Sequence, residues 1–163
     1  MTHVPYSQLI DTKRWADRGL YDAVSHNFEH LNAGEGHIML RILDHIHTVD
    51  RIFQHHLQGL PHPFKAARSE TMPTLETLAQ GSREVDDWYS SYVRGLASGD
   101  FEEPIDFAFT SGKQARMKRG EIILHVCMHG TYHRGNAGAV LQLKGLTPSR
   151  DSITDYLEAN GAG

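Results

Sequence analysis

Apolar residues recur every three or four positions along four long stretches of the chain, a spacing typical of amphipathic helices. These stretches cover residues 6–31, 37–57, about 73–96 and 120–144. The run from Asn32 to Gly36 breaks the first stretch, and Gly59 ends the second. Pro73 suits the first turn of the third helix, and Gly145 suits the end of the fourth. The pattern therefore predicts four helices.

The segment between the third and fourth helices follows a different pattern. Ile105, Phe107 and Phe109 alternate with other residues, and Ser111-Gly112 suits a tight turn, so a short β-hairpin is predicted. A last short helix is predicted over residues 152–158.

Together these elements predict an all-α fold. It is a four-helix bundle with a short β-hairpin between helices three and four and a short C-terminal helix. We expect one domain over residues 1–163. The long link between the second and third helices allows a crossover connection in place of simple up-and-down connectivity.

Composition narrows the functional classes. The net charge of −4 argues against a nucleic-acid partner, which would require a basic surface. No stretch is apolar enough to cross a membrane, and the N-terminus lacks the pattern of a secretory signal. The single cysteine, Cys127, suits a reducing compartment. We therefore expect a cytoplasmic protein with neither a nucleic-acid nor a membrane partner. Its unusual feature is twelve histidines, which can bind metal ions or move protons.

Three histidines of the fourth helix share one face. His125, His129 and His133 are spaced four residues apart, and Val126 and Leu143 fall on the same stripe, so we expect this stripe to face the core. Buried imidazoles need partners, and a metal ion would serve two of them at once. Because the outer two histidines lie ~12 Å apart along the axis, only an adjacent pair can share an ion. A third ligand must come from another helix.

The second helix offers that ligand. Relative to its apolar stripe, His45 and His47 lie equally far to either side, so periodicity alone does not separate them. Asp50 lies inside the stripe one turn after His47, and a carboxylate there could support a metal-bound group. This favours His47. The metal site is then His47, His129 and His133, with His125 more plausible as a core or supporting histidine than as a ligand.

Several familiar metal sites are excluded by the residues present. The His-Glu-x-x-His motif of zinc proteases and the Glu-x-x-His motif of di-iron bundles are both absent. One cysteine cannot build a cysteine-rich zinc site. A three-imidazole site with an open position remains. It suits a divalent transition metal, with Zn or Ni favoured and Fe or Co as alternatives.

The sequence resembles the DinB/YfiT-like superfamily over nearly its whole length. The resemblance is carried by four motifs: residues 6–24, with Arg14-Trp15-Ala16-Asp17; Ile46-His47-Thr-Val-Asp50-Arg51-Ile52-Phe53; Leu124-His125-Val-Cys-Met-His129-Gly-Thr-Tyr-His133-Arg134-Gly135; and Gly145-Leu-Thr-Pro148-Ser-Arg-Asp151. Asn136 and Tyr132 depart from the family pattern, in which glutamine and histidine are common. The resemblance implies a four-helix bundle, often a homodimer, with a metal held by one histidine of helix two and two of the late helix. Position by position, these are again His47, His129 and His133.

The resemblance also implies chemistry, because some relatives are transferases or isomerases that use a low-molecular-weight thiol. A metal ion with an open position can activate a thiol or water. Asp50 is a candidate to orient a ligand or accept a proton, the alternative being a charge pair with Arg51, Arg41 or a residue of the first helix. Tyr132 is a candidate to donate to a small-molecule substrate. We therefore expect a metal-dependent transferase or hydrolase. The alternative is a non-catalytic metal-binding or stress-response protein with a structural site. We also expect a homodimer, because the fourth helix is apolar on more than one face.

Overall fold

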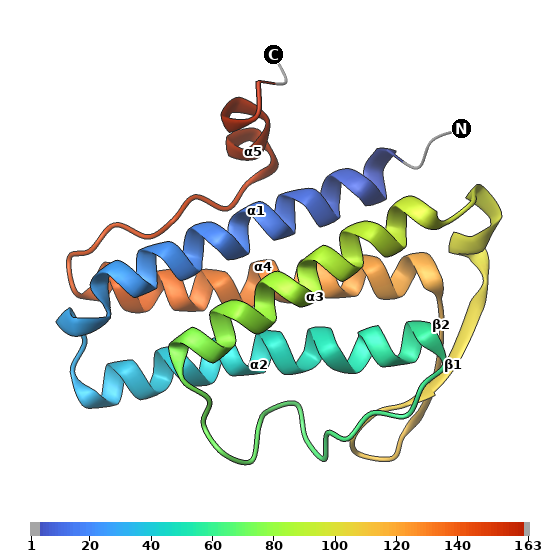
Figure 1. Cartoon of the computed structure of the whole chain (residues 1–163), viewed down its shortest axis with the longest axis horizontal. Coiled ribbons are helices and arrows are strands. Elements are labelled where there is room, and N and C mark those ends of the chain that lie inside the picture. Colours follow the sequence, from blue (N-terminus) through green and yellow to red (C-terminus); the bar gives the residue numbers. More distant parts are fainter. Residues whose placement is uncertain (1–3, 162–163) are drawn as a thin grey trace.

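The computed structural model describes residues 4–161 and shows a bundle of four long helices with a hairpin at one end (Figure 1). The predicted fold, including the hairpin and the short C-terminal helix, is confirmed. In chain order the elements are α1 (Val4–Asn27), a 3₁₀ turn (Phe28–His30), α2 (Ala33–Gln58), α3 (Leu75–Gly95), a second 3₁₀ turn (Ser98–Glu102), β1 (Pro104–Ala108), β2 (Gln114–Lys118), α4 (Arg119–Leu143) and α5 (Ile153–Ala159).

The connection between α2 and α3 is a crossover. Residues 59–74 run back along the bundle, so α2 and α3 point the same way while α1 and α4 point the other way (Figure 1). Helix α1 packs between α3 and α4, and α2 also packs between α3 and α4. Helices α1 and α2 therefore lie diagonally across the bundle. Each side of α2 faces a different helix, which decides where its histidines point.

Helix α2 begins within residues 32–36, where the sequence predicts a break between two helices. The Asn32 side chain accepts a hydrogen bond from the Glu35 backbone N–H at 2.9 Å, and the Glu35 carboxylate accepts one from the Asn32 N–H at 2.8 Å. This reciprocal pair satisfies two donors that a helix start leaves free. Because the cap compensates for the glycines of the first turn, α2 begins at Ala33, four residues earlier than predicted.

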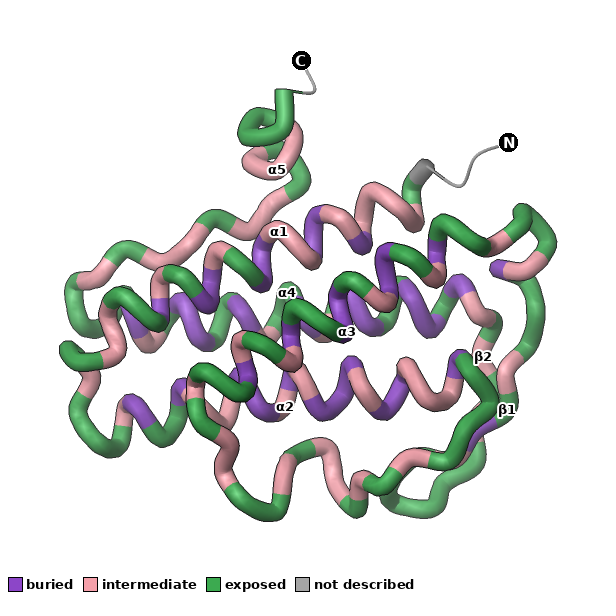
Figure 2. The backbone as a smooth tube through the Cα atoms, in the orientation of Figure 1, coloured by how far each residue is buried: buried purple, intermediate pink, exposed green. Residues whose placement is uncertain are grey.

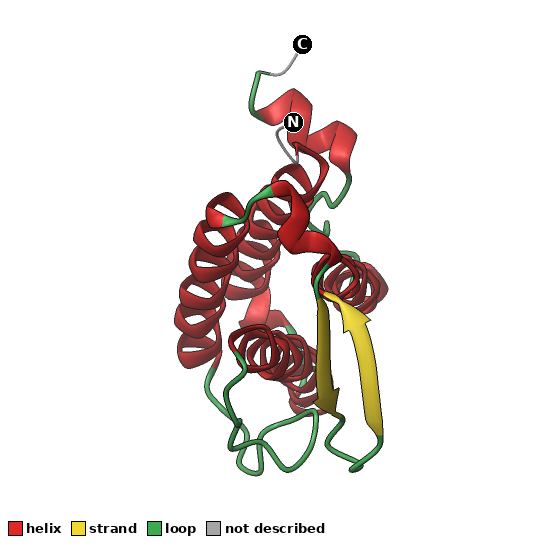
Figure 3. Ribbon diagram, turned by 90° about the vertical axis from the view of Figure 1, so that its right-hand side faces the viewer, coloured by secondary structure: helices red, strands yellow, loops and turns green. Residues whose placement is uncertain are grey.

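The hairpin closes one end of the bundle against α2 (Figure 3). Its strands are antiparallel, with Ile105 opposite Met117 and Phe107 opposite Ala115. The buried Phe107 ring lies 5.6 Å from that of Phe53 on α2, measured between ring centroids. The alternation seen in the sequence therefore places Phe107 in the core.

Buried positions recur along the four long helices (Figure 2). The apolar ones form two clusters along the bundle. On α1, Ile10 belongs to the cluster nearer the hairpin, and Leu20 and Val24 belong to the cluster at the other end. Between these positions, Lys13 and Asp17 are also buried. A layer of charged side chains therefore separates the two halves of the core.

Lys13 is the centre of this buried polar layer. Its ammonium lies 2.7 Å from a carboxylate oxygen of each of three aspartates, Asp17, Asp50 and Asp86. Burial opposes the charge on Lys13, but the three carboxylates raise its pKa well above its usual value. The same three aspartates lie close enough together to hold a metal ion. Since the ammonium already lies among them, we read them as the partners of Lys13.

Arg134 joins the polar layer from α4. Its guanidinium is buried and contacts Asp17 at 3.0 Å and Asp151 at 2.7 Å. The second pair fastens the segment before α5 to the bundle. Gly130 makes room for it, because a Cβ there would lie 2.7 Å from a terminal nitrogen of Arg134. The polar layer thus contains four carboxylates, those of Asp17, Asp50, Asp86 and Asp151, against two cations.

Candidate metal centre

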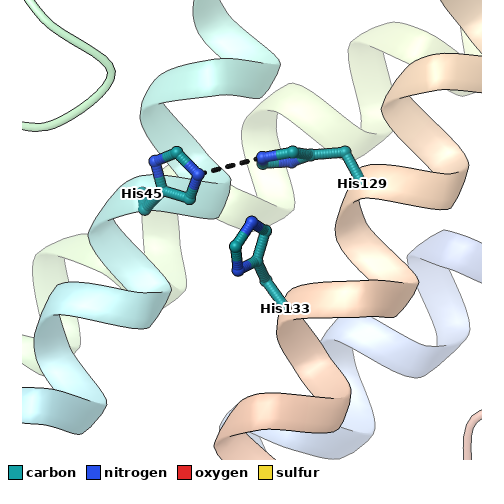
Figure 4. Close-up of side chains that lie close together, drawn as sticks. All are labelled: His45, His129 and His133. Carbon is teal, nitrogen blue, oxygen red and sulfur yellow. Dashed lines mark hydrogen bonds between the residues drawn. The ribbon is translucent and has the colours of Figure 1, made fainter.

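Three histidines from two helices meet at the seam between α2 and α4 (Figure 4). His45 comes from α2, and His129 and His133 come from α4. One ring nitrogen from each lies within 4.8 Å of the other two, and all three side chains are half-buried. The ring of His45 lies 4.8 Å from that of His129 and 4.5 Å from that of His133, measured between centroids. The cluster is therefore compact and reachable from solvent.

The link between α2 and α3 orients His45. Its Nδ1 lies 2.7 Å from the carbonyl oxygen of Ala67, and because a carbonyl can only accept, Nδ1 is the protonated nitrogen. The other nitrogen, Nε2, carries the lone pair and points at the α4 histidines (Figure 4). Asp44 holds the same link, since its buried carboxylate accepts from the Ser69 N–H at 2.9 Å. A backbone carbonyl behind a ligating histidine is a common support in metal sites.

His129 faces His45 directly. Their Nε2 atoms lie 3.0 Å apart, close to the roughly 3.0–3.4 Å between two nitrogens that each lie ~2.1 Å from one ion. Burial lowers the pKa of His129, and the neighbouring histidines lower it further, to about 3. Burial and His45 lower the pKa of His133 as well. Both rings are thus neutral near pH 7, the form that binds metals. The residues present fit a divalent transition metal ion.

Residue 47 lies on a different side of α2, so the cluster contains His45 in place of the predicted His47. Two residues along a helix are turned by ~200° about its axis. His45 therefore faces α4, and His47 faces α3, where an ideal Cβ on Gly81 would lie 2.7 Å from its Cε1 atom. Burial lowers the pKa of His47 to about 4, as expected for a neutral ring packed between helices.

The α4 histidines also differ from the expected core-facing stripe. His125 and Leu143 are exposed, the latter by 88%, whereas Ile123 and Cys127 are buried in the core. The histidine stripe therefore lies along the seam with α2 at the edge of the bundle. The His125 ring lies 5.7 Å from that of His129, so it borders the cluster without joining it.

The two candidate catalytic residues are placed differently. Asp50 is buried, and its carboxylate pairs with Lys13, a helix-one partner, instead of the clustered histidines. Tyr132 is 70% exposed, and its ring lies 5.0 Å from that of His133. Its hydroxyl has no hydrogen-bond partner among residues 4–161. Tyr132 therefore lies beside the histidine cluster, and Asp50 belongs to the buried polar layer.

Cys127 is a structural residue. It is buried in the apolar cluster near the hairpin, and burial raises the pKa of its thiol to about 12. A thiol that stays protonated is a poor nucleophile.

Comparison with protein families gives a match to the DinB family over residues 2–162. The chain belongs to the DinB family. Comparison with curated proteins and with solved structures gives no significant match. Within the part of this DinB chain that the structure describes, no helix is long and apolar enough to cross a membrane.

Proposed function

We propose that this DinB protein is a metal-dependent enzyme that binds one divalent transition metal ion through His45, His129 and His133 and acts on a small molecule. The observation that carries the proposal is the convergence of three ring nitrogens within 4.8 Å of one another. His45 presents Nε2 because its Nδ1 donates to Ala67. The lowered pKa of His129 keeps its lone pair free. Zn and Ni suit three imidazoles best, with Fe and Co as alternatives.

The number of ligands favours catalysis over a structural role. Structural zinc sites have four protein ligands, whereas catalytic sites have three and an open position. No fourth histidine, cysteine or carboxylate joins the cluster in the described part of the chain. A bound ion would supply Lewis acidity and lower the pKa of a ligating water or low-molecular-weight thiol. The exposed Tyr132 hydroxyl beside His133 could then donate a hydrogen bond to the substrate.

Reconstitution of the purified chain tests this proposal. We expect one Zn or Ni ion per chain by elemental analysis, and metal-dependent conjugation of a small thiol, or hydrolysis of an activated ester. His129→Ala should lose both the metal and the activity. His30→Ala, which removes an exposed histidine in the 3₁₀ turn after α1, is the matched control and should retain them. A tightly bound ion without turnover of any thiol or ester would favour the structural alternative, and less than one ion in ten chains would contradict the metal site.

A further inference from the structure

An open hollow adjoins the histidine cluster on the outer side of α2. It has a volume of about 660 Å³ and is lined by His37, Arg41, His45, Ala66, Ala67 and Arg68. His45 therefore belongs both to the cluster and to the wall of the hollow. Ala67, in the link between α2 and α3, also lines the hollow, and its carbonyl holds the His45 ring. A molecule in this hollow would lie next to the metal ligands.

The charges around the hollow favour an anion. Arg41 contacts the buried Asp44 carboxylate at 3.4 Å, which offsets one positive charge. Arg68 is exposed and pairs with no carboxylate in the described chain. Two arginines against one aspartate leave a net charge of +1. The neighbouring Lys65 and Glu70 cancel each other, because they pair at 2.8 Å. The guanidinium of Arg68 is therefore free to pair with a bound anion.

The hollow runs along one face of α2. His37, Arg41 and His45 are spaced four residues apart, so they share that face and span ~12 Å. An anion bound beside Arg41 would lie about one helical turn from His45. Ala66 and Ala67 leave space for it, since neither side chain extends beyond Cβ. These dimensions suit a small metabolite.

We infer that this hollow binds the anionic group, a carboxylate or a phosphate, of the small molecule on which the histidine site acts. The inference rests on the proposed function for its link to the metal, but the anion subsite itself is built from Arg41 and Arg68. A guanidinium matches the two oxygens of either group with parallel hydrogen bonds. Arg68 supplies the free charge, and Arg41, held by Asp44 and the Ser69 carbonyl, supplies a guanidinium in a fixed position. Binding of the anion places the rest of the substrate against His45.

Titration of the full-length chain with succinate and with inorganic phosphate tests the subsite. The amide signals of an isotope-labelled sample, followed by NMR, report the binding constant for each anion. The two titrations distinguish a carboxylate from a phosphate site. We expect Arg68→Gln to weaken the better anion by about fivefold or more, and binding to weaken as salt is added. Arg116→Gln, which removes an exposed arginine from the hairpin, should change it by less than about twofold.

A second titration separates this inference from the proposed function. The Co²⁺-loaded chain is titrated with mercaptosuccinate and with uncharged 2-mercaptoethanol, and the visible absorption of the ion reports thiol ligation. Arg68→Gln should weaken only mercaptosuccinate. Equal effects of Arg68→Gln and Arg116→Gln on all anions would overturn the subsite, even if metal binds. Failure to bind Co²⁺, with the anion titrations as expected, would overturn the metal site and leave the subsite standing.

Discussion

The ring of His47 occupies the space that a side chain at Gly81 would need. An ideal Cβ on residue 81 would lie 2.7 Å from Cε1 and 2.8 Å from Nε2 of His47, closer than real Cβ contacts. The two residues belong to α2 and α3, so their contact sets how closely these helices approach. His47 is thus a packing residue, and it lies outside the histidine cluster.

This contact predicts a strong coupling between the two positions. Gly81→Ala should lower the free energy of unfolding by about 1–3 kcal/mol, because the His47 ring must shift within a packed interior. In a His47→Ala background the space is open, and the same change should raise stability by about 0.5–1 kcal/mol, the gain of alanine over glycine within a helix. Urea unfolding of the four proteins gives the coupling energy. A coupling near zero would show that the ring moves aside freely.

The metal content of alanine variants distinguishes the histidines that bind the ion from those that do not. His45→Ala, His129→Ala and His133→Ala should each lose most of the bound metal, because each removes one of three converging nitrogens. His47→Ala should lower the melting temperature and keep the metal, since its ring packs against α3. Elemental analysis after dialysis measures the retained ion for each variant.

His125→Ala is the matched control for the α4 histidines, because its ring lies on the same stripe but outside the cluster. It should retain metal. Full metal content in His45→Ala together with loss in His47→Ala would show that α2 binds the ion in the originally predicted register.

Helical periodicity predicted most of the fold, because each long helix buries one stripe. The beginning of α2 was missed because Asn32 to Gly36 contains two glycines, and the capping pair with Glu35 outweighs them. The choice between His45 and His47 depended on which helix lies on each side of α2. That is set by the crossover of residues 59–74, which periodicity does not define.

The partner of Asp50 could not be identified from the periodicity of α2 for a related reason. A buried carboxylate needs a partner, and its partner is a lysine 37 residues earlier in the chain. A signal was present in helix one, where Ile10, Lys13, Asp17 and Leu20 follow core spacing. Two charges on a core stripe indicate an internal ion pair. Such a pair gives Asp50 a partner in the first helix, and it removes the reason for favouring His47 over His45.

The position of Asp50 predicts a pH-dependent effect on stability. Burial raises the pKa of Asp50 to about 6, despite the attraction of Lys13. The folded state therefore holds a proton that the unfolded state has released above pH ~4, so this residue's contribution to stability falls as pH rises through 6. Asp50→Asn removes the titration. Its melting temperature relative to the unchanged protein should rise from pH 4 to pH 7.

Both proteins contain the same histidines. The difference between their melting temperatures at each pH therefore does not include the titration of the histidines. Metal content should be equal, because the Asp50 carboxylate contacts Lys13 and not the histidine cluster. A large loss of metal or of activity in Asp50→Asn would instead support the role suggested by the sequence.

The expected homodimer has a candidate surface on α4. Several apolar residues of α4 are unavailable for such a surface, because Ile123, Cys127 and Leu141 lie in the core of the chain itself. Three exposed apolar residues of α4, Leu124, Met128 and Tyr132, are spaced four residues apart and form one stripe beside the histidine cluster. An exposed apolar stripe of this kind is typical of an interface between subunits.

We therefore predict that two chains pair along this stripe. Light scattering at micromolar concentration should give twice the chain mass of 18.3 kDa, since closed twofold dimers are the commonest assemblies. Met128→Glu places a charge on a residue that is 73% exposed in the single chain, so it should leave the fold intact and shift the mass to that of one chain. Leu143→Glu changes a residue at the end of α4 that is 88% exposed, and it should leave the dimer unaffected. A single-chain mass for the unchanged protein, or equal dissociation by both variants, would place the interface elsewhere or exclude it.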